Sequence, residues 1–475
     1  MTNWLPSLEK SGNPLYIELA DAIEHDIESG KLPPGTKLPP QRNIAFDIGV
    51  TVGTISRGYA LARERGLVSG EIGRGTYVLD KAGVLDRTGT MLAPHAVLSK
   101  PGTNKTARHD VINFGYASAM DVGQDTTIAH VASGIAEGQP KKVMDYIRDI
   151  PDSWTEAGRK WLSTGGWTPD HETVIPTNGA HAGIMAAIVS ITAPGDKVAF
   201  EGLTYCSVAR STALLGRRIA IAEFDEAGLI PEAFERLCAQ QHPKVLYLMP
   251  AVQNPTLARL SRERRKAIGE IAHRYNVWII EDFIYGPLVD DDCEPIAHFA
   301  PDRTFHVGGL SKAVSAGIRA GWIACPPRYA ARIANAHKLM SGGGSFWLKE
   351  MASQIVLSGD ADRVRHEIRR ETEKRSALAR KVLGDHDIVS RDSLPYMWIR
   401  LPEPWNSGTF KNTLADHRIL VSDEDEFKPT RSEQVFHGVR VGFSSPHSWQ
   451  ELEAPFKIIR NLLESGNTGY DGGCE

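Results

Sequence analysis

One glycine-rich part of the chain contains a lysine, a serine and an arginine. Together these side chains could bind an aldehyde that carries a phosphate. The stretch runs Phe305-His306-Val307-Gly308-Gly309-Leu310-Ser311-Lys312, and Arg319 follows in a second glycine-containing turn. The amine of Lys312 can form a Schiff base with pyridoxal phosphate (PLP), and Ser311 and Arg319 can donate to its phosphate. Because a lysine beside glycines is also common in solvated loops, the assignment depends on its surroundings.

Polar residues follow the predicted strands upstream of this lysine. Residues 277–281 predict a buried strand, with Asp282 at its carboxyl end and Tyr285 three residues later; residues 245–250 predict another, followed by Asn254. Ligands of open α/β sheets bind at this edge. Asp282 can keep the pyridine nitrogen of PLP protonated, and Tyr285 or Asn254 can donate to the ring hydroxyl.

A third part of the site precedes a predicted helix that begins near Ala182. Gly179 and Ala180 stand just before it, and backbone amides at a helix start bind phosphate. In this order and spacing, the motifs resemble the fold type I, aspartate-aminotransferase-like PLP proteins over roughly residues 112–465. The resemblance implies a Schiff base at Lys312 and a pyridinium partner at Asp282. It also implies ring-hydroxyl donors at Asn254 and Tyr285, and phosphate ligands at Gly179, Ala180, Ser311 and Arg319.

Three further roles come from the resemblance alone. Tyr205 matches the aromatic residue that stacks on the cofactor ring, and Tyr146 matches a residue that reaches the phosphate of a partner subunit. Arg440 matches the arginine that grips a substrate carboxylate. The sequence departs from the pattern at Gly309, which lacks a phosphate-binding hydroxyl, and at Ser393-Leu394-Pro395-Tyr396, where a smaller, histidine-containing stretch is expected. We therefore expect a dissociable cofactor and a reshaped ligand pocket.

The composition indicates a multidomain globular protein. The chain has 475 residues, 41% of them hydrophobic, and a net charge of -4, so no overall field points to nucleic acid or membrane. Five widely spaced cysteines give no metal or disulfide pattern. Without a signal peptide or an 18-residue apolar stretch, the expected location is cytoplasmic.

The first 78 residues have the pattern of a winged helix-turn-helix. Residues 14–29 place apolar side chains on one helical face and end at Gly30; a proline-rich turn leads to a short helix ending near Gly49, and Thr51 can cap a third helix to about Glu64. Residues 67–78 predict a hairpin. The stretch resembles the GntR family through Pro14-Leu15-Tyr16, Leu32-Pro33-Pro34-Gly35 and Gly73-Arg74-Gly75-Thr76.

The charge of this unit is concentrated in its second half. Residues 1–78 contain eight Lys/Arg and nine Asp/Glu, but residues 31–78 contain seven basic and three acidic ones. A local basic face is what DNA phosphates require. The resemblance implies that the DNA contacts come from Arg42, Thr51, Thr54, Arg57 and Arg74. Val52-Gly53 stands where relatives often carry polar base-contacting residues, which leaves the base preference open.

The domain organisation follows from these parts. We predict a DNA-binding unit at 1–78, a linker at 79–111, an α/β aminotransferase-like domain at 112–465 with a small α+β subdomain from about 360, and a polar tail at 466–475. The larger part should be a mostly parallel sheet. After Ala330 a long helical pattern leads to Glu367-Ile368-Arg369-Arg370.

Both halves together resemble the MocR subgroup of GntR regulators. The resemblance implies a head-to-tail homodimer that binds double-stranded operator DNA and senses PLP or an amino compound, controlling genes of vitamin B6, amino-acid or amine metabolism. The alternative is a working PLP-dependent aminotransferase with a DNA-binding appendage. The same site residues serve both functions, so the sequence leaves the two open.

Overall fold

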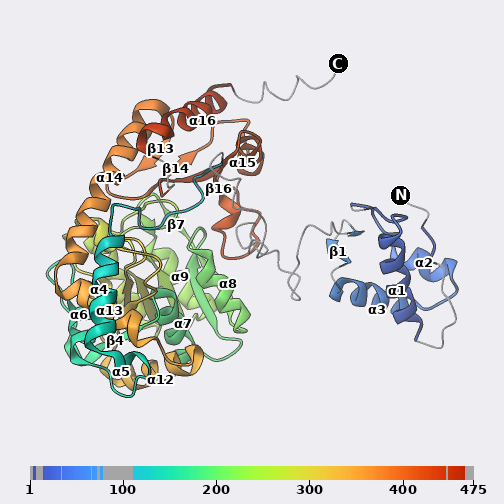
Figure 1. Ribbon diagram of the computed structural model, residues 1–475. Helices are drawn as coiled ribbons and strands as arrows, with labels where there is room; N and C mark the ends of the chain where they lie inside the picture. Colours follow the sequence, from blue (N-terminus) through green and yellow to red (C-terminus); the bar gives the residue numbers. More distant parts are fainter. Residues whose placement is uncertain are drawn as a thin grey trace. The chain divides into compact units, whose positions relative to one another are not determined.

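The computed structural model describes residues 4–6, 14–33, 35–65, 67–71, 75–78, 111–444 and 448–465. The chain divides into two compact units, Met1–Lys105 and Thr106–Glu475, and each is described by itself (Figure 1). Apart from Val111, the predicted linker lies outside the described residues, as does the predicted tail.

Three helices and a hairpin make up the first unit: α1 (Leu15–Glu28), α2 (Gln41–Asp47), α3 (Val52–Glu64), β1 (Val68–Glu71) and β2 (Gly75–Val78). The predicted helix-turn-helix and hairpin are confirmed. Thr51 caps α3, because its Oγ1 accepts a hydrogen bond from the amide of Thr54 at 3.2 Å. The strands β1 and β2 pair antiparallel.

The core of this unit forms where α1 packs on α3. Leu19 and Ile23 of α1, Ile55 and Tyr59 of α3 are buried together. A Cβ atom at Gly58 would lie 2.6 Å from a methyl carbon of Leu19, so glycine permits the close approach of the two helices. The predicted apolar face of the first helix is thus the face that packs.

A seven-stranded sheet forms the centre of the second unit, in the order β4-β12-β11-β10-β9-β5-β6. Only β12 runs antiparallel to its neighbours, which confirms the mostly parallel sheet. The central strands are apolar because both faces of the sheet are covered. The strands are β4 (Val174–Thr177), β5 (Lys197–Glu201), β6 (Arg218–Ala222), β9 (Val245–Leu248), β10 (Trp278–Asp282), β11 (Thr304–Gly309) and β12 (Gly321–Ala324).

Within the described part of this unit, three helices precede the first strand of the sheet, and others lie between its later strands. They are α4 (Asp125–Gly138), α5 (Pro140–Val143), α6 (Asp152–Leu162), α7 (Ala180–Ile191), α8 (Cys206–Leu214), α9 (Pro231–Gln241), α10 (Arg262–Arg274) and α11 (Ile296–Phe299). The helical pattern expected after Ala330 is broken into α12 (Ala330–Ser341), α13 (Phe346–Leu357) and α14 (Asp360–Leu383). Gly342, Gly343 and Gly359 interrupt it with positive φ values of 67°, 97° and 90°.

A smaller sheet, in the order β13-β14-β17-β16, carries the C-terminal part. Its elements are β13 (Ile388–Ser390), β14 (Tyr396–Arg400), α15 (Ser407–Asp416), β16 (Ser422–Asp423), β17 (Gly438–Gly442) and α16 (Glu453–Ser465). Beside it, β3 (Ile112–Asn113) pairs parallel with β15 (Ile419–Leu420), so chain from before the large sheet joins the C-terminal part.

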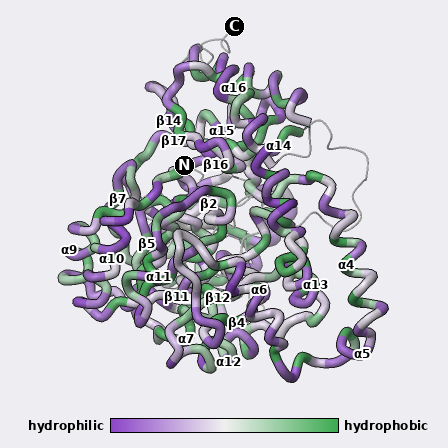
Figure 2. The backbone as a smooth tube through the Cα atoms, turned by 90° about the vertical axis from the view of Figure 1, so that its left-hand side faces the viewer, coloured by the Kyte–Doolittle hydropathy of each residue, from purple (hydrophilic) through white to green (hydrophobic). Residues whose placement is uncertain are grey.

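Helix α14 connects the two sheets. Ala361, Val364 and Ile368 belong to the core of the large sheet, while Ala379 and Leu383 belong to the core of the small one. In Figure 1 the helix runs from beside α4 and α13 toward β13 and β14, and it is largely hydrophilic in Figure 2 because its other faces are charged.

Candidate cofactor and effector site

Lys312 lies in the turn after β11, at the carboxyl ends of the parallel strands. Its Nζ donates a hydrogen bond to the backbone carbonyl of Ala117 at 2.5 Å and lies 5.7 Å from the centre of the Tyr285 ring. Burial, together with the charges of Arg440 and Arg319, lowers the pKa of Lys312 to about 8. A substantial neutral fraction, the nucleophilic form of an amine, therefore exists near neutral pH.

Asp282 ends β10 and is buried. Its Oδ2 accepts a hydrogen bond from Tyr247 Oη at 2.7 Å, and Oδ1 accepts the amide of Ile284 at 3.0 Å. Burial raises the pKa of Asp282, although the Tyr247 hydroxyl and the Ile284 amide act to lower it. A cation beside this carboxylate, such as a protonated pyridine nitrogen, would oppose the effect of burial.

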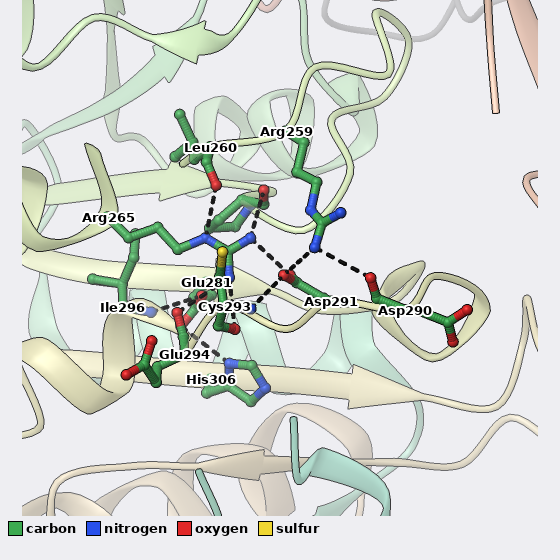
Figure 3. A network of polar contacts seen from close by, with 11 residues as sticks. Arg259, Leu260, Arg265, Glu281, Asp290, Asp291, Cys293, Glu294, Ile296 and His306 are labelled. Atoms are coloured by element: carbon green, nitrogen blue, oxygen red, sulfur yellow. Dashed lines mark hydrogen bonds and ion pairs between the residues drawn. The ribbon is translucent and has the colours of Figure 1, made fainter. Parts of the chain in front are cut away.

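The neighbouring Glu281 points to the other side of the sheet and serves the fold (Figure 3). Its carboxylate accepts the amides of Ile296 and Ala297 at 3.0 and 3.1 Å and lies 3.1 Å from Nδ1 of His306. Burial would raise the pKa of Glu281, but the charge of His306 and these hydrogen bonds hold it below its usual range. His306 is buried, and its ring centre lies 4.9 Å from that of Phe283.

A second buried network holds the loops that follow β9 and β10 (Figure 3). Arg265 binds Asp291 at 2.7 Å and donates to the carbonyls of Pro250, Leu260 and Cys293 at 3.3, 3.1 and 3.1 Å. The loop carrying Asn254 begins and ends at two of these carbonyls. One buried guanidinium therefore fixes both ends of that loop.

Glycines form the phosphate end of the site around the start of α7. A Cβ atom at Gly321 would lie 3.0 Å from the amide nitrogen of Ala180, and one at Gly309 would lie 3.3 Å from it. Gly179 has a φ of 94°, and Arg319 also has a positive φ, 49°. Ser311 is half-buried and Arg319 exposed in the turns beside them. The glycine at 309 thus has a steric reason, the close approach of the Ala180 amide.

His181, in the first turn of α7, has a buried nitrogen without a partner. Its Nε2 lies 3.3 Å from Ser211 Oγ, whereas Nδ1 forms no hydrogen bond. Burial and the charge of Arg319 lower the pKa of His181. A histidine held neutral at this helix start leaves the positive end of α7 and Arg319 to attract an anion.

These donors fit PLP. Lys312 would supply the amine for the aldehyde, Asp282 the carboxylate for the pyridine nitrogen, and the Gly179–Ala180 amides with Ser311 and Arg319 the phosphate contacts. A phosphate-binding loop needs backbone amides that nothing covers. Gly309 and Gly321 leave the Ala180 amide uncovered, because neither carries a side chain.

Arg440, on β17, lies close to Asn254. Its Nη1 donates to Asn254 Oδ1 at 2.9 Å and its Nη2 to the carbonyl of Gly115 at 2.7 Å, while Nε is buried without a partner. The guanidinium carbon lies 4.8 Å from the centre of the Phe427 ring. The structure thus brings Lys312, Asn254, Tyr285 and Arg440 around one segment of backbone, residues 115–117.

The two remaining predicted cofactor contacts differ in placement. Tyr205 lies at the start of α8, with its ring edge-on to His181 at 6.4 Å, and is 37% exposed. Tyr146 is 86% exposed, and no contact within the described chain joins it to the other predicted site residues. Its role as a ligand of a partner subunit stays a prediction.

Several residues of the site carried no sequence signal. Tyr247 lies inside a buried strand, and Gly115 and Ala117 contribute backbone carbonyls, which no motif announces. Tyr396 was visible as a departure from the expected pattern, although its contacts with Tyr285 and Arg440 span many residues of sequence.

The predicted DNA contacts lie at the start of α2 and along α3. Arg42 and Arg57 are exposed, and the guanidinium of Arg57 lies 5.9 Å from the centre of the Tyr16 ring. Thr51 caps α3, and its hydroxyl lies 3.0 Å from that of Thr54 in the first turn. Arg74 lies outside the described residues.

The described part of the chain has neither a membrane-spanning helix nor a metal cluster. Within the described ranges, no helix is long and apolar enough to cross a membrane. The same part of the chain contains no group of three or more His, Cys, Asp or Glu side chains placed to bind a metal.

Comparison with known proteins follows this division of the chain. The family model "Aminotransferase class I and II" matches residues 109–427, and "Bacterial regulatory proteins, gntR family" matches residues 15–78. The HTH-type transcriptional regulator YdeF of Bacillus subtilis is 28% identical over 467 residues, covering 97% of each chain. The HTH-type pyridoxine biosynthesis transcriptional regulator PdxR of Corynebacterium glutamicum is 22% identical over 418 residues, 86% of this chain and 83% of that one.

Solved structures confirm the fold of the larger unit. An archaeal alanine:glyoxylate aminotransferase superimposes with a TM-score of 0.68 at 21% identity, covering 76% of this chain and 92% of that one. The multiple substrate aminotransferase of Thermococcus profundus gives 0.67 at 18% identity, covering 79% and 97%. The chain therefore belongs to the class I and II aminotransferase family, whose members depend on PLP. A gntR-family domain precedes this part of the chain. That order of domains is the organisation of the MocR subgroup of transcription regulators.

Proposed function

We propose that this protein is a DNA-binding transcription regulator whose aminotransferase-like domain senses PLP or an amino compound bearing an acid group. One observation carries the proposal: the carbonyls of Gly115 and Ala117, two residues apart, accept hydrogen bonds from Arg440 and Lys312. An acid-binding and an amine-bearing side chain therefore face the same short segment of backbone.

Each residue of the cleft has a distinct part in this function. PLP, when bound, supplies an aldehyde that reacts with amines. Lys312 holds the cofactor and can yield its place to an incoming amine. Asp282 binds the ring nitrogen from the buried side, and Arg440 binds the far acid group of the effector through charge-assisted hydrogen bonds.

The genes under control are those of vitamin B6, amino-acid or amine metabolism. PdxR of Corynebacterium glutamicum, whose name assigns it to pyridoxine biosynthesis, supports this proposal. The binding unit is a head-to-tail homodimer, in which Tyr146 of each chain reaches the phosphate of the other. Two copies of α3 then contact two half-sites of the operator through the major groove.

A second candidate function is transamination. The half-buried Lys312, whose pKa of about 8 leaves part of it neutral near neutral pH, favours it, because this amine is also suited to proton transfer. Steady-state formation of keto acids from a panel of amino acids separates the two functions, since a sensor binds its effector without sustained turnover.

The decisive experiment measures operator affinity of the full-length protein with and without PLP, and then with each of the 20 amino acids. An effector that shifts the affinity tenfold must favour one state by about 1.4 kcal/mol. Arg440→Ala should abolish the response to an acidic effector while leaving basal DNA binding nearly intact. Arg400→Ala, on the neighbouring strand and paired with Glu226 and Asp387, should respond normally.

Two results would contradict the proposal. One is a wild-type protein that binds its own promoter no better than random DNA, with and without PLP. The other is operator affinity that no amino acid and no change in PLP occupancy alters, which would leave a constitutive regulator.

A further inference from the structure

Tyr396 is the residue at which the chain departs from the stretch expected beside the ligand pocket, and its side chain is fully buried. Its ring centre lies 5.2 Å from that of Tyr285, at an interplanar angle of 61°. The guanidinium carbon of Arg440 lies 5.4 Å from the same ring. The Tyr396 ring thus contacts Tyr285, which is predicted to bind the cofactor ring, and Arg440, which is predicted to bind the acid group of the effector.

The hydroxyl of Tyr396 makes a third connection. It donates to the backbone carbonyl of Gln253 at 3.1 Å, immediately before Asn254. The side chain of Gln253 is itself fastened, since its Nε2 donates to the carbonyl of Leu203 at 2.5 Å and its Oε1 accepts from Thr256. Burial raises the pKa of Tyr396 well above its ordinary value, so the hydroxyl remains a donor.

Arg440 completes the arrangement. Its guanidinium carbon lies 5.4 Å from the centre of the Tyr396 ring and 4.8 Å from that of Phe427, and its Nη1 donates to Asn254 Oδ1 at 2.9 Å. Tyr396 therefore holds Asn254 twice, through the Gln253 backbone and through Arg440. Both hydrogen bonds, from Tyr396 to Gln253 and from Arg440 to Asn254, are buried.

We propose that Tyr396 is a positioning residue that fixes Arg440 and the Asn254 loop relative to each other, and so sets the affinity for a carboxylate and for the cofactor ring together. This inference rests on the proposed function of the same site. It adds a residue and a coupling that the motifs do not contain.

The hydroxyl and the ring of Tyr396 have separable effects. Tyr396→Phe keeps the ring under Arg440 and removes the tether to Gln253, so it should act mainly at the cofactor end. Tyr396→Leu also removes the aromatic face from Arg440, so it should act at the acid end as well. Tyr275 follows α10, and its hydroxyl lies 3.5 Å from Glu235 on α9, so Tyr275→Phe is the control.

The experiment uses the full-length protein and three measurements. PLP affinity is measured by absorbance titration, the bound chromophore is titrated with pH, and propionate, an acid without an amine, is titrated into the PLP-loaded protein. Tyr396→Phe should weaken PLP binding about threefold to tenfold, the range of one hydrogen bond, and shift the chromophore titration. Its propionate affinity should stay within about twofold of wild type. Tyr396→Leu should lose about fivefold or more in propionate affinity.

The outcomes separate positioning from simple packing. A Tyr396→Phe protein with wild-type PLP affinity and chromophore titration overturns the proposal. So does a Tyr396→Leu protein that binds propionate as wild type does, or a wild-type protein that binds PLP but not propionate. A loss of thermal stability with no change in any of the three measurements assigns Tyr396 a purely structural role. Failure of the proposed function differs, because the wild type would then lack operator binding or any response to ligand.

Discussion

The amine of Lys312 lies 2.5 Å from the backbone carbonyl of Ala117, a residue that precedes it by 195 positions. The backbone can lie there because Gly442 has no side chain: a Cβ atom at that position would be 1.9 Å from the carbonyl oxygen of Tyr116. In sequence, β3 and Phe114 separate this segment from the predicted linker.

Lys312 should be the only lysine whose loss abolishes the covalent cofactor adduct. Lys312→Ala should lose the PLP adduct that borohydride reduction traps, together with the yellow colour of the purified protein. Lys349→Ala is the matched control, because burial lowers the pKa of Lys349 to about 8 as well. Peptide mapping of the reduced protein locates the adduct. An adduct that survives Lys312→Ala would show that the central assignment is wrong.

The rate of PLP uptake should depend on pH through Lys312. The neutral amine attacks the aldehyde, and the pKa of Lys312 is lowered to about 8. Uptake by cofactor-free protein should therefore rise about tenfold per pH unit below pH 8 and level off above it. An unperturbed lysine would continue to rise to about pH 10. Stopped-flow absorbance distinguishes the two profiles.

The lowered pKa of Lys312 also predicts how the free energy of unfolding changes with pH. Between about pH 8 and pH 10 the unfolded chain still binds the proton of Lys312 and the folded chain does not. The free energy of unfolding of the cofactor-free protein should therefore increase with pH across this window, relative to Lys312→Met. Equal slopes for the two proteins in denaturant titrations would contradict it.

The fold could be predicted largely because its signals are local. Local sequence signals predicted three parts of the fold. They are the helix cap at Thr51, the apolar strands next to Asp282 and Asn254, and the glycines at the phosphate end of the site. Parallel strands then bring their carboxyl ends to one edge. The break of the helical stretch at Gly342 and Gly359 had a signal as well, but the apolar periodicity on both sides masked it.

The rest of the site depends on contacts between distant residues. Tyr247 orients Asp282 from a neighbouring strand, and nothing in its apolar strand distinguishes it from a core residue. The carbonyl of Gly115 meets Arg440 across 325 positions. A backbone carbonyl carries no residue signature, so the partners of Arg440 and Lys312 required coordinates.

Asp282 and Glu281 should have opposite phenotypes although they are adjacent on β10. Asp282→Asn should fold with near wild-type stability and bind PLP at least tenfold more weakly, because a neutral amide cannot pair with the pyridinium. Glu281→Gln should instead cost about 3 kcal/mol of unfolding free energy by breaking a buried pair with His306. Thermal unfolding and PLP titration of both variants test this contrast. Equal effects on PLP affinity would contradict the placement of the two carboxylates on opposite faces.

Arg57 should contact a DNA phosphate, and Arg65 should not. Arg57 is exposed on α3 and forms no ion pair with any described residue, whereas Arg65 binds Asp21 at 2.6 Å and Glu24 at 2.8 Å within the unit. Arg57→Ala should weaken operator binding and reduce the slope of log affinity against log salt by about 1. Arg65→Ala removes internal ion pairs that are partly exposed, so it should change stability by at most about 1 kcal/mol and leave the salt slope unchanged. Fluorescence anisotropy over a range of salt concentrations gives both slopes. If Arg65→Ala lowers the slope and Arg57→Ala does not, the DNA lies on another face of this unit and the assignment of α3 to the major groove is wrong.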